Sequence, residues 1–189
     1  MIIWKIGFII IKKKLQNAIS LNYPKNKLDI VIASDNCTDN TDSIVEDFIK
    51  DHKDFKIRLI KTKEHRGKTN AQNEAQKTVT NEILVMTDAN SMLKLDSIRE
   101  IVSSFSDDNI SYVCGKLVYT NIDNLTCDSE SYYWNLDLKM RDIESKFQTI
   151  TAGNGALYAC RNKDYVIIEP IFCHDSMMPY LYALKGKRA

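Results

Sequence analysis

A short apolar run that stops abruptly at an acid is the feature that most limits how this chain can fold. The run covers residues 83–90 (ILVMTDAN). Its first part is rich in β-formers and is typical of a buried parallel strand, and open α/β sheets bind ligands at the carboxyl ends of such strands. Asp88 and Asn90 offer oxygen ligands suited to Mg²⁺ or Mn²⁺, an ion that could in turn hold a phosphate. The alternative interpretation of Asp88 is a helix N-cap or an ordinary loop acid.

A second apolar run, residues 28–33 (LDIVIA), leads into another acidic and polar loop, residues 34–41 (SDNCTDNT). Between the two runs lies a basic turn, residues 64–71 (EHRGKTNA), which continues into a helical pattern. Two acids at strand ends and one basic loop suit a nucleoside diphosphate bound together with a metal ion.

Charge and cysteine usage narrow the possible functions. The formal net charge is +1, so no overall field favours nucleic acid as a partner. The five cysteines are odd in number and form no CxxC pair, which argues against a disulfide framework or a zinc site. We therefore expect a reducing compartment, the cytoplasm. A length of 189 residues predicts one domain, residues 1–189.

The first eleven residues are apolar and are followed by three lysines, residues 12–14. This segment is shorter than the roughly 20 residues that a membrane span needs. It also lacks the small-residue cleavage site of a signal peptide. We expect residues 1–11 to form a core strand, and a surface anchor is the alternative.

Strand and helix patterns alternate from residue 12 to residue 105. Such alternation predicts right-handed βαβ crossovers and an α/β fold, a three-layer α/β/α sandwich with a mainly parallel central sheet. The strands that end at Ala33 and Thr87 should lie close together, with their loops on one side. The expected strands are residues 28–33, 56–60 and 83–87, and the expected helices are residues 12–21, 41–52, 68–79 and 95–105.

The pattern changes after residue 110. We expect a long strand over residues 110–119 and a helix over residues 129–147, whose aromatic residues either join the core or line a cleft. Gly153 and Gly155 precede a further strand and allow the backbone to approach a ligand or a packed neighbour closely. Asp175 stands just before a short helix.

Five segments, in this order, resemble the motifs of the family 2 glycosyltransferases, which have the GT-A fold. The similarity extends over nearly the whole chain from about Lys12. The segments are residues 23–41, similar to the family's second strand and "sDgStDgT" loop; 67–73 (GKTNAQN), similar to "GKxxAlN"; 87–90, similar to the DxD position; 153–158 (GNGALY), similar to the acceptor-side strand; and 174–175, similar to the "ED" or "DD" base.

Three departures from the family pattern accompany this resemblance. Residues 1–11 contain no counterpart of the family's opening "iPayNE" turn, and the DxD position ends in Asn90 rather than an acid. The chain also stops before the "QxxRW" helix and membrane helices of the polymer-forming members. We therefore expect a truncated or altered copy of the family's catalytic domain.

The resemblance implies an inverting transfer of a sugar from a nucleotide-sugar donor, expected to be a UDP-sugar, to a hydroxyl of a glycan or lipid-linked acceptor. It assigns a divalent cation, Mg²⁺ or Mn²⁺, to Asp88 and Asn90, and the acceptor side to Gly153, Asn154 and Gly155. It also implies peripheral association with the cytoplasmic face of a membrane. The remaining implied roles are nucleotide binding by Asp35, Arg66, Lys68 and Asp88, and general-base catalysis by Asp175.

Each of these assignments has a simpler alternative. Asp35 could cap a turn, Lys68 could be a solvated helix residue and Asp175 could be an N-cap, while His174 is expected to be a bystander. At the level of the whole chain, the alternatives are an inactive fragment of a glycosyltransferase and a nucleotidyltransferase built on a similar sheet.

Overall fold

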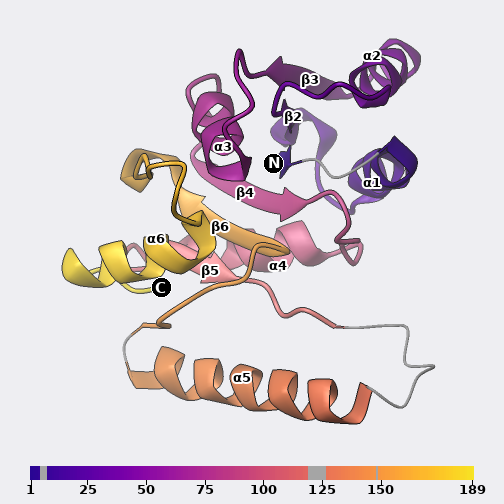
Figure 1. Cartoon of the computed structure of the whole chain (residues 1–189). Helices are drawn as coiled ribbons and strands as arrows, with labels where there is room; N and C mark the ends of the chain where they lie inside the picture. The colour runs from indigo at the N-terminus through magenta and orange to yellow at the C-terminus, as the bar shows by residue number, and fades with distance from the viewer. Residues whose placement is uncertain (5–7, 119–126, 148) are drawn as a thin grey trace.

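The structure, a computed structural model, describes residues 1–4, 8–118, 127–147 and 149–189 (Figure 1). Within these ranges the strands are β1 (Ile2–Trp4), β2 (Asp29–Ser34), β3 (Lys56–Lys61), β4 (Ile83–Asp88), β5 (Tyr112–Cys114) and β6 (Leu157–Arg161). The α-helices are α1 (Phe8–Ser20), α2 (Thr41–Asp51), α3 (Lys68–Gln76), α4 (Ser97–Ser103), α5 (Cys127–Phe147) and α6 (His174–Leu184).

The strands in the described ranges form one six-stranded sheet in the order β3-β2-β1-β4-β6-β5. β1 pairs in parallel with β2 and β4, and β2 pairs in parallel with β3. β6 runs antiparallel to both of its neighbours, β4 and β5. Parallel neighbours need a long crossover connection, which the intervening helices provide. The predicted α/β fold with a mainly parallel sheet is confirmed.

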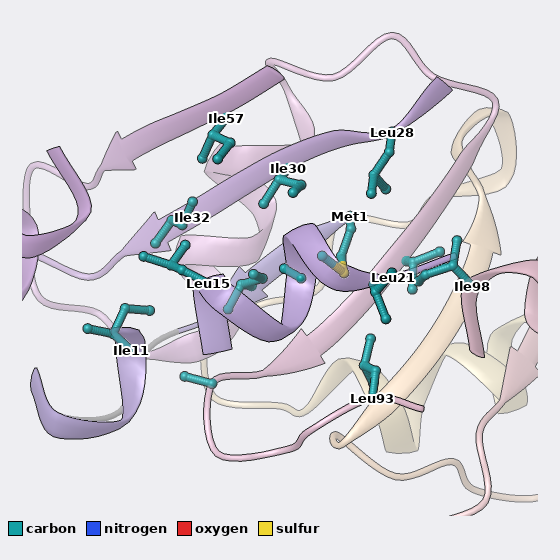
Figure 2. Close-up of a cluster of buried hydrophobic side chains, with 14 of the residues drawn as sticks. Met1, Ile11, Leu15, Leu21, Leu28, Ile30, Ile32, Ile57, Leu93 and Ile98 are labelled. Carbon is teal, nitrogen blue, oxygen red and sulfur yellow. The ribbon is translucent and has the colours of Figure 1, made fainter. Parts of the chain in front are cut away.

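Helices cover both faces of this sheet (Figure 1). One hydrophobic cluster packs α1, α2 and α4 against one face, and a second packs α3 and α6 against the other. The side chains of β2 alternate between them, because successive residues of a strand point to opposite faces. Ile30 and Ile32 join the first cluster and Val31 and Ala33 the second. Figure 2 shows the first cluster, with Leu15 of α1 beside Ile32.

The strand register places Asp35 and Asp88, the acids at the strand ends, at the same edge of the sheet. Trp4 of β1 pairs with Ala33 of β2 on one flank and with Asp88 of β4 on the other. Asp35 directly follows β2, so its position and that of Asp88 lie at the same carboxyl edge with only β1 between their strands. The expectation that the strands ending at Ala33 and Thr87 lie close together is confirmed.

The prediction of one core strand over residues 1–11 is wrong in its extent. β1 covers only Ile2–Trp4, and α1 has begun at Phe8; residues 5–7 lie outside the described part of the chain. Ile11, Leu15 and Ala18 are buried at helical spacing on α1. Isoleucine suits both strand and helix interiors when it is buried, so the packing of α1 on the sheet, not the residue type, decided where the strand ends.

The predicted long strand over residues 110–119 is also shorter than expected. β5 covers only Tyr112–Cys114, and one further backbone hydrogen bond to β6, from Gly115 N–H to the carbonyl of Leu157, follows it. Residues 119–126 lie outside the described part of the chain. α5 was predicted at nearly its observed bounds, but its side chains from residue 127 to residue 135 are not among those described. Among the described helices, none combines the length and the apolar character needed to cross a bilayer.

Candidate active site

A side chain at position 155 would displace at least one charged group, because three of them surround the place that its Cβ would take. That place lies 2.6 Å from Lys68 Nζ and 3.2 Å from an oxygen of each of Asp88 and Asp175. The Lys68 ammonium also donates a hydrogen bond to Asp88 Oδ1. Gly155 is therefore needed for the close approach of these groups, and we call the four residues the Gly155 cluster.

Four separate elements bring the Gly155 cluster together. Lys68 is the first residue of α3, Asp88 the last residue of β4, and Asp175 lies in the first turn of α6. Gly155 precedes β6, whose Leu157 pairs with Thr87 and so sets the glycine loop beside the end of β4. The N-cap of α6 is Cys173, so Asp175 does not serve as the N-cap that was its simpler alternative.

The glycine loop is also tied to the backbone of Asp175. Gly153 N–H donates to the carbonyl oxygen of Asp175 over 2.8 Å. A Cβ at position 153 would fall 2.0 Å from the hydroxyl oxygen of Tyr112, so only glycine fits. The Asn154 side chain holds the loop itself: its Nδ2 donates to the carbonyl of Gly115 over 2.8 Å, and its Oδ1 accepts from Ala156 N–H over 3.1 Å.

Asp35 organises the basic loop that leads into α3. This residue is only 3% exposed. Its Oδ2 accepts from Gly67 N–H over 2.7 Å, and its Oδ1 accepts from Arg66 N–H and from the Thr62 hydroxyl, both over 3.1 Å. Gly67 has a φ of +90°, a left-handed conformation that glycine adopts without strain. Asp35 thus fixes the turn from which Lys68 extends.

Arg66 and Asn90, which were predicted to bind the nucleotide and the metal ion, are not members of the Gly155 cluster. Arg66 is exposed on the basic loop, and Asn90 is exposed in the turn after Asp88. That turn is closed by a hydrogen bond from Ser91 N–H to the carbonyl of Asp88 over 3.2 Å. Side chains of both signs therefore stand at the carboxyl edge of the sheet, as the sequence predicted for Asp35, Lys68 and Asp88.

The donor chemistry of the Gly155 cluster fits a divalent cation that arrives with a phosphate. In the described ranges no group of three or more His, Cys, Asp and Glu side chains forms a ready metal site. The carboxylates of Asp88 and Asp175 nevertheless share the space beside Gly155. Mg²⁺ commonly takes one or two protein carboxylates and completes its shell with substrate phosphates and water.

His174 links α6 to α3 rather than joining the Gly155 cluster. Its Nδ1 lies 2.9 Å from Gln72 Oε1, and its Nε2 lies 2.8 Å from the Tyr165 hydroxyl and 3.0 Å from Asn73 Oδ1. Burial, with a smaller contribution from the charge of Lys68, lowers the pKa of His174 to about 4. The imidazole is therefore neutral near pH 7 and helps to place Asp175, its neighbour in the chain.

Two residues that were not predicted from the sequence, Lys14 and Thr87, support the Gly155 cluster through hydrogen bonds. Lys14 on α1 donates to the Thr87 hydroxyl over 2.9 Å, and the Thr87 hydroxyl donates to the carbonyl of Ala156 over 2.7 Å. A signal was present, because Lys14 shares a helical stripe with the buried Ile11 and Ala18. It was overlooked because Lys14 closes a run of three lysines, which is normally solvated.

Charged groups at the carboxyl edge of a mainly parallel sheet define a class, the open α/β proteins that bind ligands at their strand ends. The sequence profile described as Glycosyl transferase family 2 matches residues 10–165, so the chain belongs to glycosyl transferase family 2.

Solved structures agree with this assignment. The mannosyltransferase PcManGT from Pyrobaculum calidifontis, in complex with GDP-Man and Mn²⁺, matches with a TM-score of 0.84 and 26% identity, over 100% of this chain and 52% of that one. TarS from S. aureus, in complex with UDP-GlcNAc, matches with a TM-score of 0.56 and 17% identity, over 66% of this chain and 35% of that one. The second likeness concerns the fold alone, and together they place the chain among the GT-A folds.

Curated relatives match over shorter stretches. Poly-β-1,6-N-acetyl-D-glucosamine synthase from Staphylococcus epidermidis is 34% identical over 95 residues, which cover 50% of this chain and 22% of that protein. β-Monoglucosyldiacylglycerol synthase from Nostoc sp. is 26% identical over 104 residues, which cover 55% of this chain and 22% of that protein. The matched part is thus less than a quarter of each relative.

Proposed function

We propose that this chain transfers a sugar from a nucleoside diphosphate donor to an acceptor hydroxyl, with inversion at the anomeric carbon. The observation that supports it most is the convergence of Lys68, Asp88 and Asp175 beside Gly155. A transferase of this type needs positive charge at a leaving diphosphate and a carboxylate near the attacking hydroxyl. The Gly155 cluster holds groups of both kinds within one small space.

The donor diphosphate would bind at Lys68 and Arg66, with a divalent cation, Mg²⁺ or Mn²⁺, held by Asp88 and Asn90. When bound, such a cation neutralises the charge that builds up on the leaving phosphate. Lys68 would contribute by pairing its ammonium with phosphate oxygens, and Arg66 by offering its guanidinium from the exposed loop. The PcManGT complex with GDP-Man and Mn²⁺ is consistent with this kind of donor.

Asp35 would contribute to nucleotide binding chiefly through the loop that it organises. Both of its carboxylate oxygens already accept hydrogen bonds from the loop of residues 62–67. A direct contact from Asp35 to the base or ribose would have to share one of these oxygens. We expect the donor to be a UDP-sugar, as the resemblance to the family implies.

Asp175 would act as the general base. The proton of the acceptor hydroxyl would pass to its carboxylate as the acceptor oxygen attacks the anomeric carbon and the bond from that carbon to the diphosphate oxygen breaks. Attack from the face opposite the leaving group inverts the anomeric centre. The hydrogen bond from Gly153 N–H to the Asp175 carbonyl holds this residue, so residues 153–155 would form the acceptor side.

The acceptor would be a glycan or a lipid-linked sugar. The names of the curated relatives, a poly-N-acetylglucosamine synthase and a glucosyldiacylglycerol synthase, support both classes. We place the reaction in the cytoplasm or at the cytoplasmic face of a membrane. One alternative is a catalytically inactive glycosyltransferase chain, which is favoured by the pairing of Lys68 with Asp88.

Calorimetric titration with UDP, GDP and CDP, each with and without Mn²⁺, tests this proposal. Mn²⁺-dependent binding of one nucleotide, followed by transfer from the matching nucleotide-sugar, is the expected result. Nucleotide binding without any sugar transfer to glycan or lipid acceptors would favour the inactive alternative. Absence of binding to all three nucleotides would contradict the proposed donor site.

A further inference from the structure

Lys14 is a buried lysine on the face of α1 that packs against the sheet. Its side chain is 0% exposed, like those of its neighbours Ile11 and Leu15. The two preceding lysines of the same run, Lys12 and Lys13, are exposed. Lysine is almost never fully buried unless its ammonium has partners, so the contacts of Lys14 call for an explanation.

Those contacts lie on both sides of the predicted metal-binding residues. The Lys14 ammonium donates to the Thr87 hydroxyl over 2.9 Å and to the backbone carbonyl of Ser91. Thr87 precedes Asp88, and Ser91 follows Asn90, so the Lys14 ammonium contacts the residues at both ends of the turn of residues 88–90. These two hydrogen bonds of Lys14, which we call the brace, attach the turn to α1, a different element of the chain.

Asn17, one helical turn further along α1, continues this brace. Its Nδ2 donates to the carbonyl of Leu93 over 2.9 Å, and its Oδ1 accepts from Leu93 N–H over 2.8 Å. Residues three apart on a helix lie on the same face. Lys14 and Asn17 together attach α1 to the segment that leaves the end of β4.

The brace extends to the glycine loop through Thr87. A hydroxyl has one proton to donate, and that of Thr87 goes to the carbonyl of Ala156 over 2.7 Å while its oxygen accepts from Lys14. Ala156 follows Gly155. Lys14 thus orients the hydroxyl that joins the end of β4 to the glycine loop, the two segments that supply Asp88 and Gly155 to the cluster.

This arrangement does not serve stability well. Burial lowers the pKa of Lys14 to about 7, and the charge of Asp88 opposes the fall. Burying an ammonium group costs free energy unless its partners compensate for the lost hydration. A methionine at position 14 would retain much of the packing without the desolvation of an ammonium, so the contacts point to a role other than holding the fold.

We propose that Lys14 is a positioning residue, which holds the turn of residues 88–90 and the glycine loop of residues 153–156 in the relative placement that the site requires. The part of this inference that concerns the bound ligand rests on the proposed function. The part that concerns the placement of the two segments does not depend on it.

The test compares Lys14→Met with the matched control Lys13→Met, which removes an exposed lysine from the adjacent position. Hydrogen exchange of peptides covering residues 87–92 and 153–157 is measured by mass spectrometry, together with the melting temperature and Mn²⁺–UDP affinity. In Lys14→Met we expect exchange about tenfold faster in both segments, affinity about tenfold weaker, and a melting temperature no lower than that of the parent. Lys13→Met should match the parent in all three.

Parent-like exchange in both segments of Lys14→Met would overturn the inference, and so would a uniform rise in exchange with a lower melting temperature, which indicates a structural role alone. If Lys14→Met does not fold, Thr87→Val decides: faster exchange in residues 153–157 supports the brace, and parent-like exchange there rejects it. If the parent binds no nucleotide with Mn²⁺, the proposed donor site fails, while the exchange comparison still decides the role of Lys14.

Discussion

An oxygen of Asp88 and an oxygen of Asp175 approach the same point beside Gly155, each 3.2 Å from the place that a Cβ of residue 155 would take. Asp88 ends a strand, whereas Asp175 belongs to the first turn of the last helix. The Lys68 ammonium lies 2.6 Å from the same point and donates to Asp88. The positive charge of Lys68 therefore stands near both negative groups.

Gly155→Ala should weaken Mn²⁺–UDP binding with little change in stability. The new methyl group would lie 2.6 Å from Lys68 Nζ, the end of a flexible side chain that can move aside at small cost. Lys68 would then leave its place in the cluster. Calorimetry and thermal melting of the variant check both parts.

Gly115→Ala is the matched control for that variant. Its Cβ would lie 2.8 Å from Leu157 Cδ2 and 2.9 Å from Leu157 Cβ, outside the cluster. Overpacking of this kind costs about 1–3 kcal/mol, so the control should lose stability and keep more of its affinity. The reverse ranking of the two variants in affinity would count against the Gly155 cluster as the binding site.

Asp88→Ala should abolish Mn²⁺-dependent UDP binding, because the cation would lose its charged ligand in the turn of residues 88–90. Asn90→Asp should keep or strengthen binding, since a carboxylate replaces a neutral amide as oxygen donor. Titration of both variants with UDP in the presence and absence of Mn²⁺ measures this. Asp51→Ala, at the exposed end of α2, serves as the control for a lost surface acid. Parent-like binding by both site variants would place the metal elsewhere.

Asp175→Asn should leave nucleotide binding intact and lower sugar transfer by about 10²-fold or more, the range typical of a lost general base. The substitution preserves the size of the side chain, and the backbone carbonyl still accepts from Gly153 N–H. Affinity from calorimetry and turnover from a transfer assay separate the two effects. Transfer near the parent rate would show that another group takes the proton.

Stability should fall as the pH drops from about 6.5 towards 4, partly because of His174. Its pKa in the folded chain is about 4, below the ordinary value of 6.5. Between these values the unfolded chain binds the proton and the folded chain does not, so stability is fully present above pH 6.5 and declines below it. The contribution is at most about 3.5 kcal/mol, from about 1.4 kcal/mol per pKa unit.

Urea unfolding of the parent and of His174→Asn at several pH values isolates this contribution. The buried amino group of Met1, whose pKa burial lowers to about 5, adds a slope of the same sign between pH 5 and 8 in both proteins. The variant should therefore lose only the part of the slope between pH 4 and 6.5. Identical slopes in the two proteins would mean that His174 does not titrate in this way.

The fold could be predicted from the sequence because buried parallel strands and amphipathic helices leave local patterns. The run of residues 83–87 is apolar because both faces of β4 are covered, and the helices between strands repeat at their own period. The sequence also predicted that Asp35 and Asp88 lie at the same edge of the sheet, because parallel strands direct their carboxyl ends the same way. These conclusions need only neighbours in the chain and the rules of strand connection.

The partners of the site residues depended on contacts between distant segments, which local patterns do not record. Asp35 accepts hydrogen bonds from the loop of residues 62–67, and Lys68 donates to Asp88, because α3 packs against the sheet face at β1 and β2. Lys14 differs from the exposed Lys13 because α1 turns that position towards Thr87. The sequence alone thus indicated the strands, the helices and the sheet edge at which Asp35 and Asp88 lie. Tertiary packing decided which side chains are buried and which groups they contact, and these two properties set the electrostatic environment of each group.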